Sequence, residues 1–257
     1  MLSVKTPRRP PVDRAAALSG PSSDEWRVAH ALLTLMHELP LPTGFPQRTE
    51  LEDEMRTLEI DALRPTQGTH GRREVEKKAD AYRAMSEHDL AQSIRDKPVP
   101  IVNGPASMCF ATDHHHVAAA LKLAGIGHVP VIVVADLSSL SESRFWVEME
   151  NNHWVHPFDA HGRRMAFRAL PQHVWESQED DFRDLAAAAR DAGGYVKTDV
   201  PLAEFRWAAF FRRYLPAPTS ESEYQALIPK AAALARTELA LGLPGFEEAS
   251  ASAASQR

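Results

Sequence analysis

The stretch from residue 107 to residue 136 limits the possible folds more than any other part of the chain. In order, it contains a short apolar strand, a polar junction, an alanine-rich helix and a second strand, at 107–112, 113–116, 114–124 and 128–136. Gly125 and Gly127 close the helix, and the second strand is rich in β-branched residues. A strand, helix and strand in this order predict a fold in which a sheet is covered by helices.

The polar junction is Asp113-His114-His115-His116, at the start of the predicted helix. The first turn of a helix has unpaired backbone N–H groups and the positive end of the helix dipole, so polar residues there favour an anion or phosphate site. Successive helical residues point about 100° apart, so at most one or two of the histidines can face one ligand. The pattern therefore argues against a zinc site of three histidines.

The rest of the chain divides into segments of different character. Strands are predicted at 58–63 and 99–102, and 99–102 forms a hairpin with 107–112. Helices are predicted at 25–38, 72–85, 87–95, 141–151, 171–175, 180–192, 202–214 and 221–241. We expect a disordered arm (1–24), a helix with a connector (25–55), a mixed sheet core (56–137), a helical region packed on it (138–245) and a disordered tail (246–257).

Charge and cysteine content exclude several classes of protein. The chain has 35 acidic and 29 basic residues, which does not suit a protein that coats nucleic acid. The single cysteine, Cys109, excludes an internal disulfide framework. The sequence contains no apolar run of about 18 residues and its first residues lack the apolar stretch of a secretory signal. We therefore expect a cytoplasmic protein without a membrane partner; its oligomeric state stays open.

Two motifs carry a resemblance to a known family. The first has the pattern P-T-Q-x-x-x-G-x-x-E-V-x-x-K, and the second has the pattern D-x-H-H-x-x-x-A-L. Their residues are Pro65, Thr66, Gln67, Gly71, Glu74, Val75 and Lys78, then Asp113, His115, His116, Ala120 and Leu121. With both motifs in order, the chain resembles the ParB/sulfiredoxin superfamily, and within it the ParB-like nuclease group.

The resemblance implies an α+β fold, with a small mixed ParB/sulfiredoxin-like sheet and helices plus a helical C-terminal region. It also implies that a nucleotide such as ATP or CTP binds with its phosphates near the helix start. The implied catalytic residues are Asp113, His115 and His116, with Asp113 holding Mg²⁺ or Mn²⁺. The implied ligand-binding residues are Arg64, Thr66, Gln67, Gly71, Lys78 and His114.

The chain differs from the superfamily at residues 114–116, and these differences argue against two of the superfamily's functions. His114 stands where sulfiredoxin-like enzymes carry the reactive cysteine, which argues against sulfinate reduction. His115 and His116 replace the arginines of chromosome-partitioning ParB, and the later helices show no basic recognition face, which argues against stable DNA binding.

Three functions remain open. The first is binding of a nucleotide or other phosphate-bearing ligand, with metal-assisted phosphoryl transfer or hydrolysis. The second is a ligand-binding or regulatory module without catalysis, and the third is a DNA nuclease. A separate metal site at His153 and His156, three residues apart, is a further alternative, although Pro157 argues against the helix that it requires.

Overall fold

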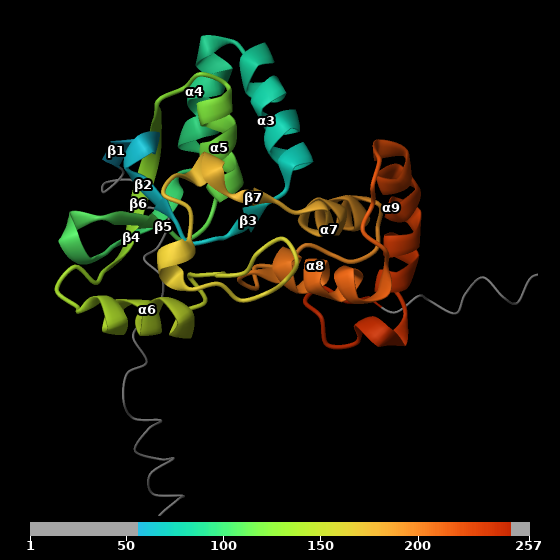
Figure 1. Ribbon diagram of the computed structural model, residues 1–257. Coiled ribbons are helices and arrows are strands. Elements are labelled where there is room, and N and C mark those ends of the chain that lie inside the picture. Colours follow the sequence, from blue (N-terminus) through green and yellow to red (C-terminus); the bar gives the residue numbers. More distant parts are fainter. Residues whose placement is uncertain (1–55, 248–257) are drawn as a thin grey trace, which may run out of the picture. The chain divides into compact units, whose positions relative to one another are not determined.

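The computed structural model describes residues 56–247; the predicted arm, the helix at 25–38 and the last ten residues lie outside the described residues. A mixed five-stranded sheet is the centre of the first half of this region (Figure 1). Its antiparallel and parallel pairs alternate across the sheet. The strand order is β1 (Arg56–Glu59), β6 (His128–Asp136), β4 (Val99–Asn103), β5 (Cys109–Ala111) and β2 (Leu63–Pro65).

The strand predicted at 58–63 is wrong as a single element. Its residues form the end of β1, a 3-10 turn at Ile60–Ala62 and the start of β2, and the two strands lie at opposite edges of the sheet. Ile60 and Leu63 are fully buried, and their spacing of three matches the three residues per turn of a 3-10 helix. The turn carries the chain from one edge to the other.

Helices cover both faces of the sheet. One face packs against helices that carry Val75, Ala79, Val117 and Leu121 in a common apolar core. The other face carries Val102 and Phe110, which pack against Phe145 and Met149. The helices of the first face are α3 (Arg72–Ala84), α4 (Glu87–Arg95) and α5 (His115–Leu123), and the opposite face is covered by α6 (Glu142–Asn151).

The C-terminal helices form a second apolar core of their own, centred on Trp207 and Phe211. They are α7 (Asp181–Asp191), α8 (Ala203–Tyr214) and α9 (Glu221–Ala235). A short parallel ladder of β3 (Thr69–His70) and β7 (Gln178–Glu179) joins the two halves (Figure 1). Of the predicted helices, 171–175 contains only the start of a 3-10 turn at Val174–Glu176, and 221–241 ends early, at Ala235.

The predicted α+β class is confirmed, with the small mixed sheet and the helical C-terminal region both present. Among residues 56–247, no helix combines the length and apolar character needed to cross a membrane.

Candidate functional site

The start of α5 is formed without a side-chain cap. His114, the residue before the helix, has a left-handed backbone conformation (φ 58°, ψ 23°), and no side chain accepts a bond from the first turn. Within residues 56–247, the backbone N–H groups of His115 and His116 have no hydrogen-bond partner. The structure therefore leaves the polar groups of this helix start unpaired, as an anion site requires.

His115 ties the helix start to the end of β2. Its side chain is buried, and its Nε2 accepts a hydrogen bond of 3.0 Å from the backbone N–H of Thr66. The Thr66 hydroxyl donates to the carbonyl of Ala111 at 2.7 Å. Because Nε2 is the acceptor, the proton of the neutral ring is on Nδ1, which is buried without a partner. Burial lowers the pKa of His115 to about 4, against the opposing effect of the nearby Asp113 charge.

His116 belongs to a chain of charged groups between α5, α3 and α7. Its Nε2 lies 3.6 Å from Oε1 of Glu74, and Oε2 of Glu74 lies 3.4 Å from Nη1 of Arg183. Burial, followed by the charges of Arg183 and Lys78, lowers the pKa of His116 well below its usual value. The imidazole is therefore neutral at physiological pH, and Glu74 is shared between it and Arg183.

Asp184 holds the start of α3, although the sequence does not single it out. Its carboxylate accepts from the backbone N–H groups of Arg73 (3.0 Å) and Glu74 (3.1 Å). It packs so closely on Gly71 that a Cβ there would lie 2.3 Å from Oδ1. Burial raises the pKa of Asp184, whereas the two N–H groups and Arg73 lower it. The glycine of the first motif therefore makes room for the group that caps α3.

The other predicted site residues are spread over several contacts. Asp113 is exposed and accepts from the His114 N–H at 2.6 Å, and Nδ1 of His114 lies 2.8 Å from the Pro98 carbonyl. Arg64 turns to the carbonyl of Gln172 (3.2 Å) and to its side chain. Gln67 is buried and forms an isolated parallel bridge with His156, and Lys78 lies further along α3, where it lines a cavity together with Lys77.

The metal role of Asp113 stays a prediction, since Mg²⁺ beside a phosphate ligand needs only one or two carboxylates from the protein. In the part of the chain that the structure describes, no three His, Cys, Asp or Glu side chains are placed to hold one metal ion. His153 has a left-handed backbone (φ 58°), so His153 and His156 do not share a helix face.

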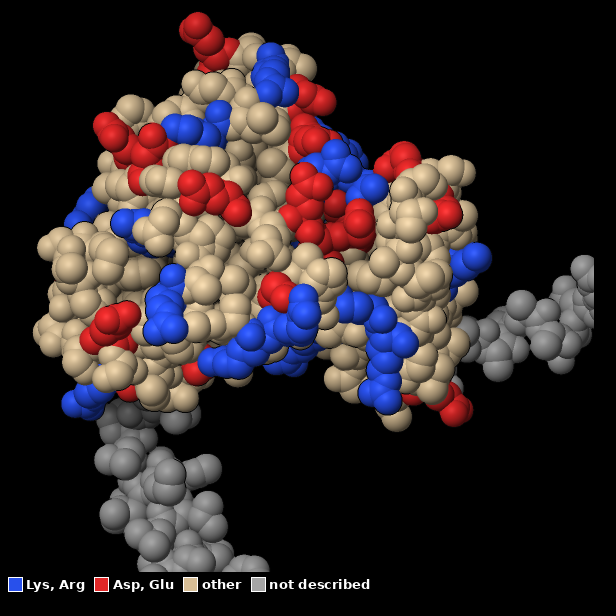
Figure 2. Space-filling model, viewed as in Figure 1, with Lys and Arg blue, Asp and Glu red and all other residues tan. Residues whose placement is uncertain are grey.

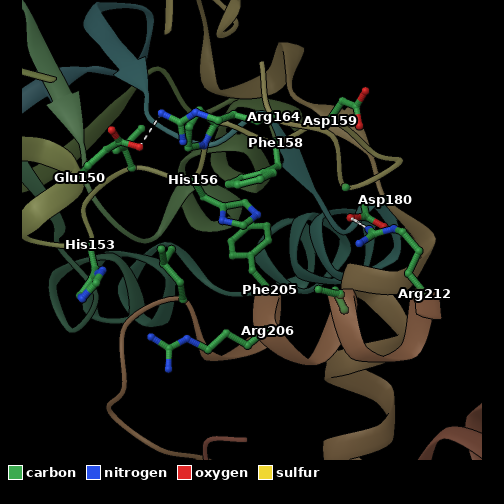
Figure 3. A pocket seen from close by; sticks show the side chains of 16 residues that line it. Glu150, His153, His156, Phe158, Asp159, Arg164, Asp180, Phe205, Arg206 and Arg212 are labelled. Atoms are coloured by element: carbon green, nitrogen blue, oxygen red, sulfur yellow. Dashed lines mark hydrogen bonds and ion pairs between the residues drawn. The ribbon is translucent and has the colours of Figure 1, made fainter. Parts of the chain in front are cut away.

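A cavity of about 380 Å³ opens on the other side of Thr66, and the sequence did not predict it (Figure 3). The backbone N–H of His156 donates to the Thr66 carbonyl at 2.8 Å, and the His156 carbonyl accepts from the N–H of Gly68 at 3.2 Å. Thr66 thus lies between His115 of α5 and His156 of this cavity. We name it the arginine cavity, because its lining includes Arg164, Arg206 and Arg212.

Three neighbouring rings line the arginine cavity: His156 is stacked on Phe205 and tilted against Phe158. His156 lies between Phe158 and Phe205, with ring centroids at 4.7 Å and 4.1 Å, as Figure 3 shows. Within the described residues, the ring nitrogens of His156 have no hydrogen-bond partner. Burial lowers the pKa of His156 to about 4, and the charges of Arg212 and Arg183 act in the same direction. The cavity therefore presents a neutral imidazole among arginines.

The acidic residues of the cavity already contact other groups of the protein, so they leave one arginine of the lining without a carboxylate partner. Glu150 pairs with Arg164 and Asp180 pairs with Arg212, each at 2.6 Å. The carboxylate of Asp159, the third acid of the lining, accepts bonds from its own loop. Arg206 has no carboxylate within 4 Å among residues 56–247. Its guanidinium is the charge that remains for a ligand.

Comparisons with known proteins agree with this fold. The model of the family described as "Putative ParB-like nuclease" matches residues 56–213. Protein Atu1540 from Agrobacterium tumefaciens is 35% identical, with a TM-score of 0.70, and the match covers 76% of this chain and 97% of that protein. No curated protein matches the chain.

A more distant likeness is found to the C-terminally truncated chromosome-partitioning protein ParB from Caulobacter crescentus, in its complex with CTP-γ-S. It is 15% identical, with a TM-score of 0.27, over 72% of this chain and 93% of that one. The family model covers more than half of the chain and both sequence motifs lie inside it, which confirms the resemblance. The chain belongs to the ParB-like family.

Proposed function

We propose that the protein binds a phosphate-bearing ligand such as a nucleotide in the arginine cavity. The observation that carries the proposal is the guanidinium of Arg206, which lines the same cavity as the neutral ring of His156 and has no carboxylate within 4 Å among residues 56–247. Guanidinium groups match the geometry of phosphate oxygens and form strong charge-assisted hydrogen bonds with them. A phosphate group therefore supplies the anionic partner that Arg206 lacks among the described residues.

The arrangement of the cavity supports an organic phosphate. Arg164, Arg206 and Arg212 lie on three sides of the stacked rings in Figure 3, while Val155 and Ala208 add apolar surface. Figure 2 shows basic side chains gathered over the loop after α6 and over α8, although the whole chain is acidic. A volume of about 380 Å³ is within the range of small-molecule sites.

Backbone strain at the rim of the cavity also supports a binding role. Leu202 (φ 59°) and His153 (φ 58°) are in the left-handed region, which is uncommon for residues other than glycine. Both residues line the cavity. Such conformations cost about 1–3 kcal/mol each and are concentrated at functional sites.

In this proposal His115 and His116 are positioning residues. Nε2 of His115 accepts a hydrogen bond from Thr66, and Nε2 of His116 lies near the carboxylate of Glu74. Both partners belong to the first motif, so the two histidines hold this motif in place and do not contact the ligand. His115 fixes the N–H of Thr66, and the carbonyl of the same residue fixes His156. Thr66 therefore connects the start of α5 to the backbone of His156.

Replacing Arg206 with glutamine is expected to weaken nucleotide binding about tenfold or more, because a charge-assisted hydrogen bond contributes about 1.5–3 kcal/mol. Calorimetric titration with ATP, CTP and a nucleoside monophosphate measures the affinity. Arg213→Gln is the matched control, since Arg213 is an exposed arginine of the same helix outside the cavity lining. Equal affinities in the two variants, or no binding to the wild type, contradict the proposal.

Hydrolysis of a phosphoester is the second candidate function, and the unpaired ring of His156 favours it. A bound phosphate raises the pKa of the ring, which then accepts a proton from water. The water oxygen forms a bond to phosphorus, the bond to the leaving oxygen breaks, and that oxygen takes up the proton from the His156 ring, which becomes neutral again. Release of phosphate by the wild type but not by His156→Gln, with ligand binding retained, is the expected result; binding without release by the wild type contradicts hydrolysis.

A further inference from the structure

A second cavity, of about 500 Å³, lies between α3, the end of α4, α7 and α9. We name it the lysine cavity, because Lys77, Lys78 and Lys97 line it. It shares no lining residue with the arginine cavity. Its ligand therefore has to be inferred from its own residues.

The uncommitted polar groups of the lysine cavity are hydrogen-bond donors. Among the described residues, Lys77, Lys78 and Lys97 have no carboxylate within 4 Å. The rings of Tyr82 and Tyr224 are buried, but neither hydroxyl has a hydrogen-bond partner within residues 56–247. These donors come from α3, α9 and the segment after α4, so they surround the cavity.

The acids that line the lysine cavity are committed elsewhere. Glu74 contacts Arg183 and His116, and Asp184 accepts from the first N–H groups of α3. Asp191 is paired with Arg190 at 3.1 Å. With the acids occupied and the lysines free, the cavity has an excess of positive charge.

Lys78 is the group that most needs an anion. It is half-buried, and burial lowers its pKa; the charge of Lys97 acts in the same direction, and the charge of Glu74 opposes it without reversing it. A half-buried ammonium group among other cations is costly unless negative charge is close to it. The neighbouring wall is apolar, with Ala81, Met85 and Ile228 in the lining.

We propose that the lysine cavity is a second anion site, which takes a small organic molecule with two or more phosphate groups. Donors on separate walls need negative oxygens that point in more than one direction, as a diphosphate offers them. The apolar wall accommodates the organic part of the molecule. This site goes beyond the proposed function, since it uses other residues and another part of the fold.

Titration of the full chain with pyrophosphate tests the proposal, with inorganic phosphate and citrate as parallel ligands. Lys78→Ala is expected to weaken pyrophosphate binding about tenfold or more. Lys230→Ala, which removes an exposed lysine of α9 outside the cavity, is expected to leave it unchanged. Tyr224→Phe removes the hydroxyl but keeps the ring and the net charge, and it is expected to weaken pyrophosphate binding several-fold.

The same titration in the Arg206→Gln background separates the two sites. Pyrophosphate binding that persists there, and is lost on adding Lys78→Ala, supports the lysine cavity even if the arginine cavity binds nothing. Three results overturn the proposal: equal affinities in Lys78→Ala and Lys230→Ala, citrate binding as tight as pyrophosphate binding, or no pyrophosphate binding in the Arg206→Gln background.

Discussion

Acidification from about pH 7.5 to about pH 4.5 is expected to lower the free energy of unfolding by about 2.5 kcal/mol through His115 alone. Burial lowers the pKa of this histidine from 6.5 to about 4 in the folded protein. The unfolded chain therefore binds the proton first, and folding stability falls as the pH drops below 6.5 and approaches 4. Above the unfolded pKa the contribution of His115 is fully present. His156 acts in the same direction, because burial lowers its pKa as well.

Urea denaturation at both pH values, followed by circular dichroism, measures this change. His115→Gln keeps a side chain that can accept from the Thr66 N–H but removes the titrating ring, so its stability is expected to change less between the two pH values. His128→Gln is the matched control, because the side chain of His128 is 64% exposed and its loss is expected to leave the wild-type pH dependence intact. If the unfolding free energy of His115→Gln falls between the two pH values as much as that of the wild type, the effect does not come from His115.

The parts of the fold that were predicted correctly are those with strong local signals. The strand at 128–136 and the helix at 87–95 have the predicted bounds. In the first case β-branched residues lie between turn formers, and in the second Ser86 caps the helix by accepting from the N–H of Asp89. The strand at 58–63 failed because the apolar and polar residues there alternate as in a strand, whereas the chain turns at Ile60–Ala62 and its two ends pair with different strands.

The site is harder to predict than the fold, because its partners are far apart in the chain. The motifs led to Thr66 and His115, which do meet, 49 residues apart. They could not lead to Asp184, which caps α3 from 111 residues away, nor to Arg206 of α8. For His156, the sequence suggests only a role as a metal ligand. Its actual environment is set by the ring of Phe205, which comes from α8, about fifty residues later in the chain. No local pattern records such contacts.

The start of the α5 helix shows how a local rule was overridden. Asp113 has the residue type of a helix cap, but it bonds only to the next N–H, and His114 takes the capping position with a left-handed backbone. Asparagine, aspartate and histidine tolerate this conformation better than most residues. The result is a helix start whose first N–H groups are unpaired within the described residues.

Replacing Gly71 with alanine is expected to destabilise the protein by about 3 kcal/mol, since overpacking a tight site costs about 1–3 kcal/mol and loss of a helix cap about 1 kcal/mol. The new Cβ would lie 2.3 Å from Oδ1 of Asp184 and 2.9 Å from its Cγ. Asp184 is buried and held by two backbone N–H groups, so it cannot move without releasing the start of α3. Glu74 and Lys78 lie on this helix, so ligand binding in the lysine cavity is expected to weaken together with stability.

Gly127→Ala is the matched control, because a Cβ there meets no atom within 4 Å. Its unfolding free energy is expected to equal that of the wild type or to exceed it slightly, since alanine restricts the unfolded chain. The double variant Gly71→Ala with Asp184→Ala tests the cause: it removes the clash but not the loss of the cap, so it is expected to be less destabilised than the sum of the two single variants. If the two effects simply add, Gly71 is required for a reason other than its contact with Asp184.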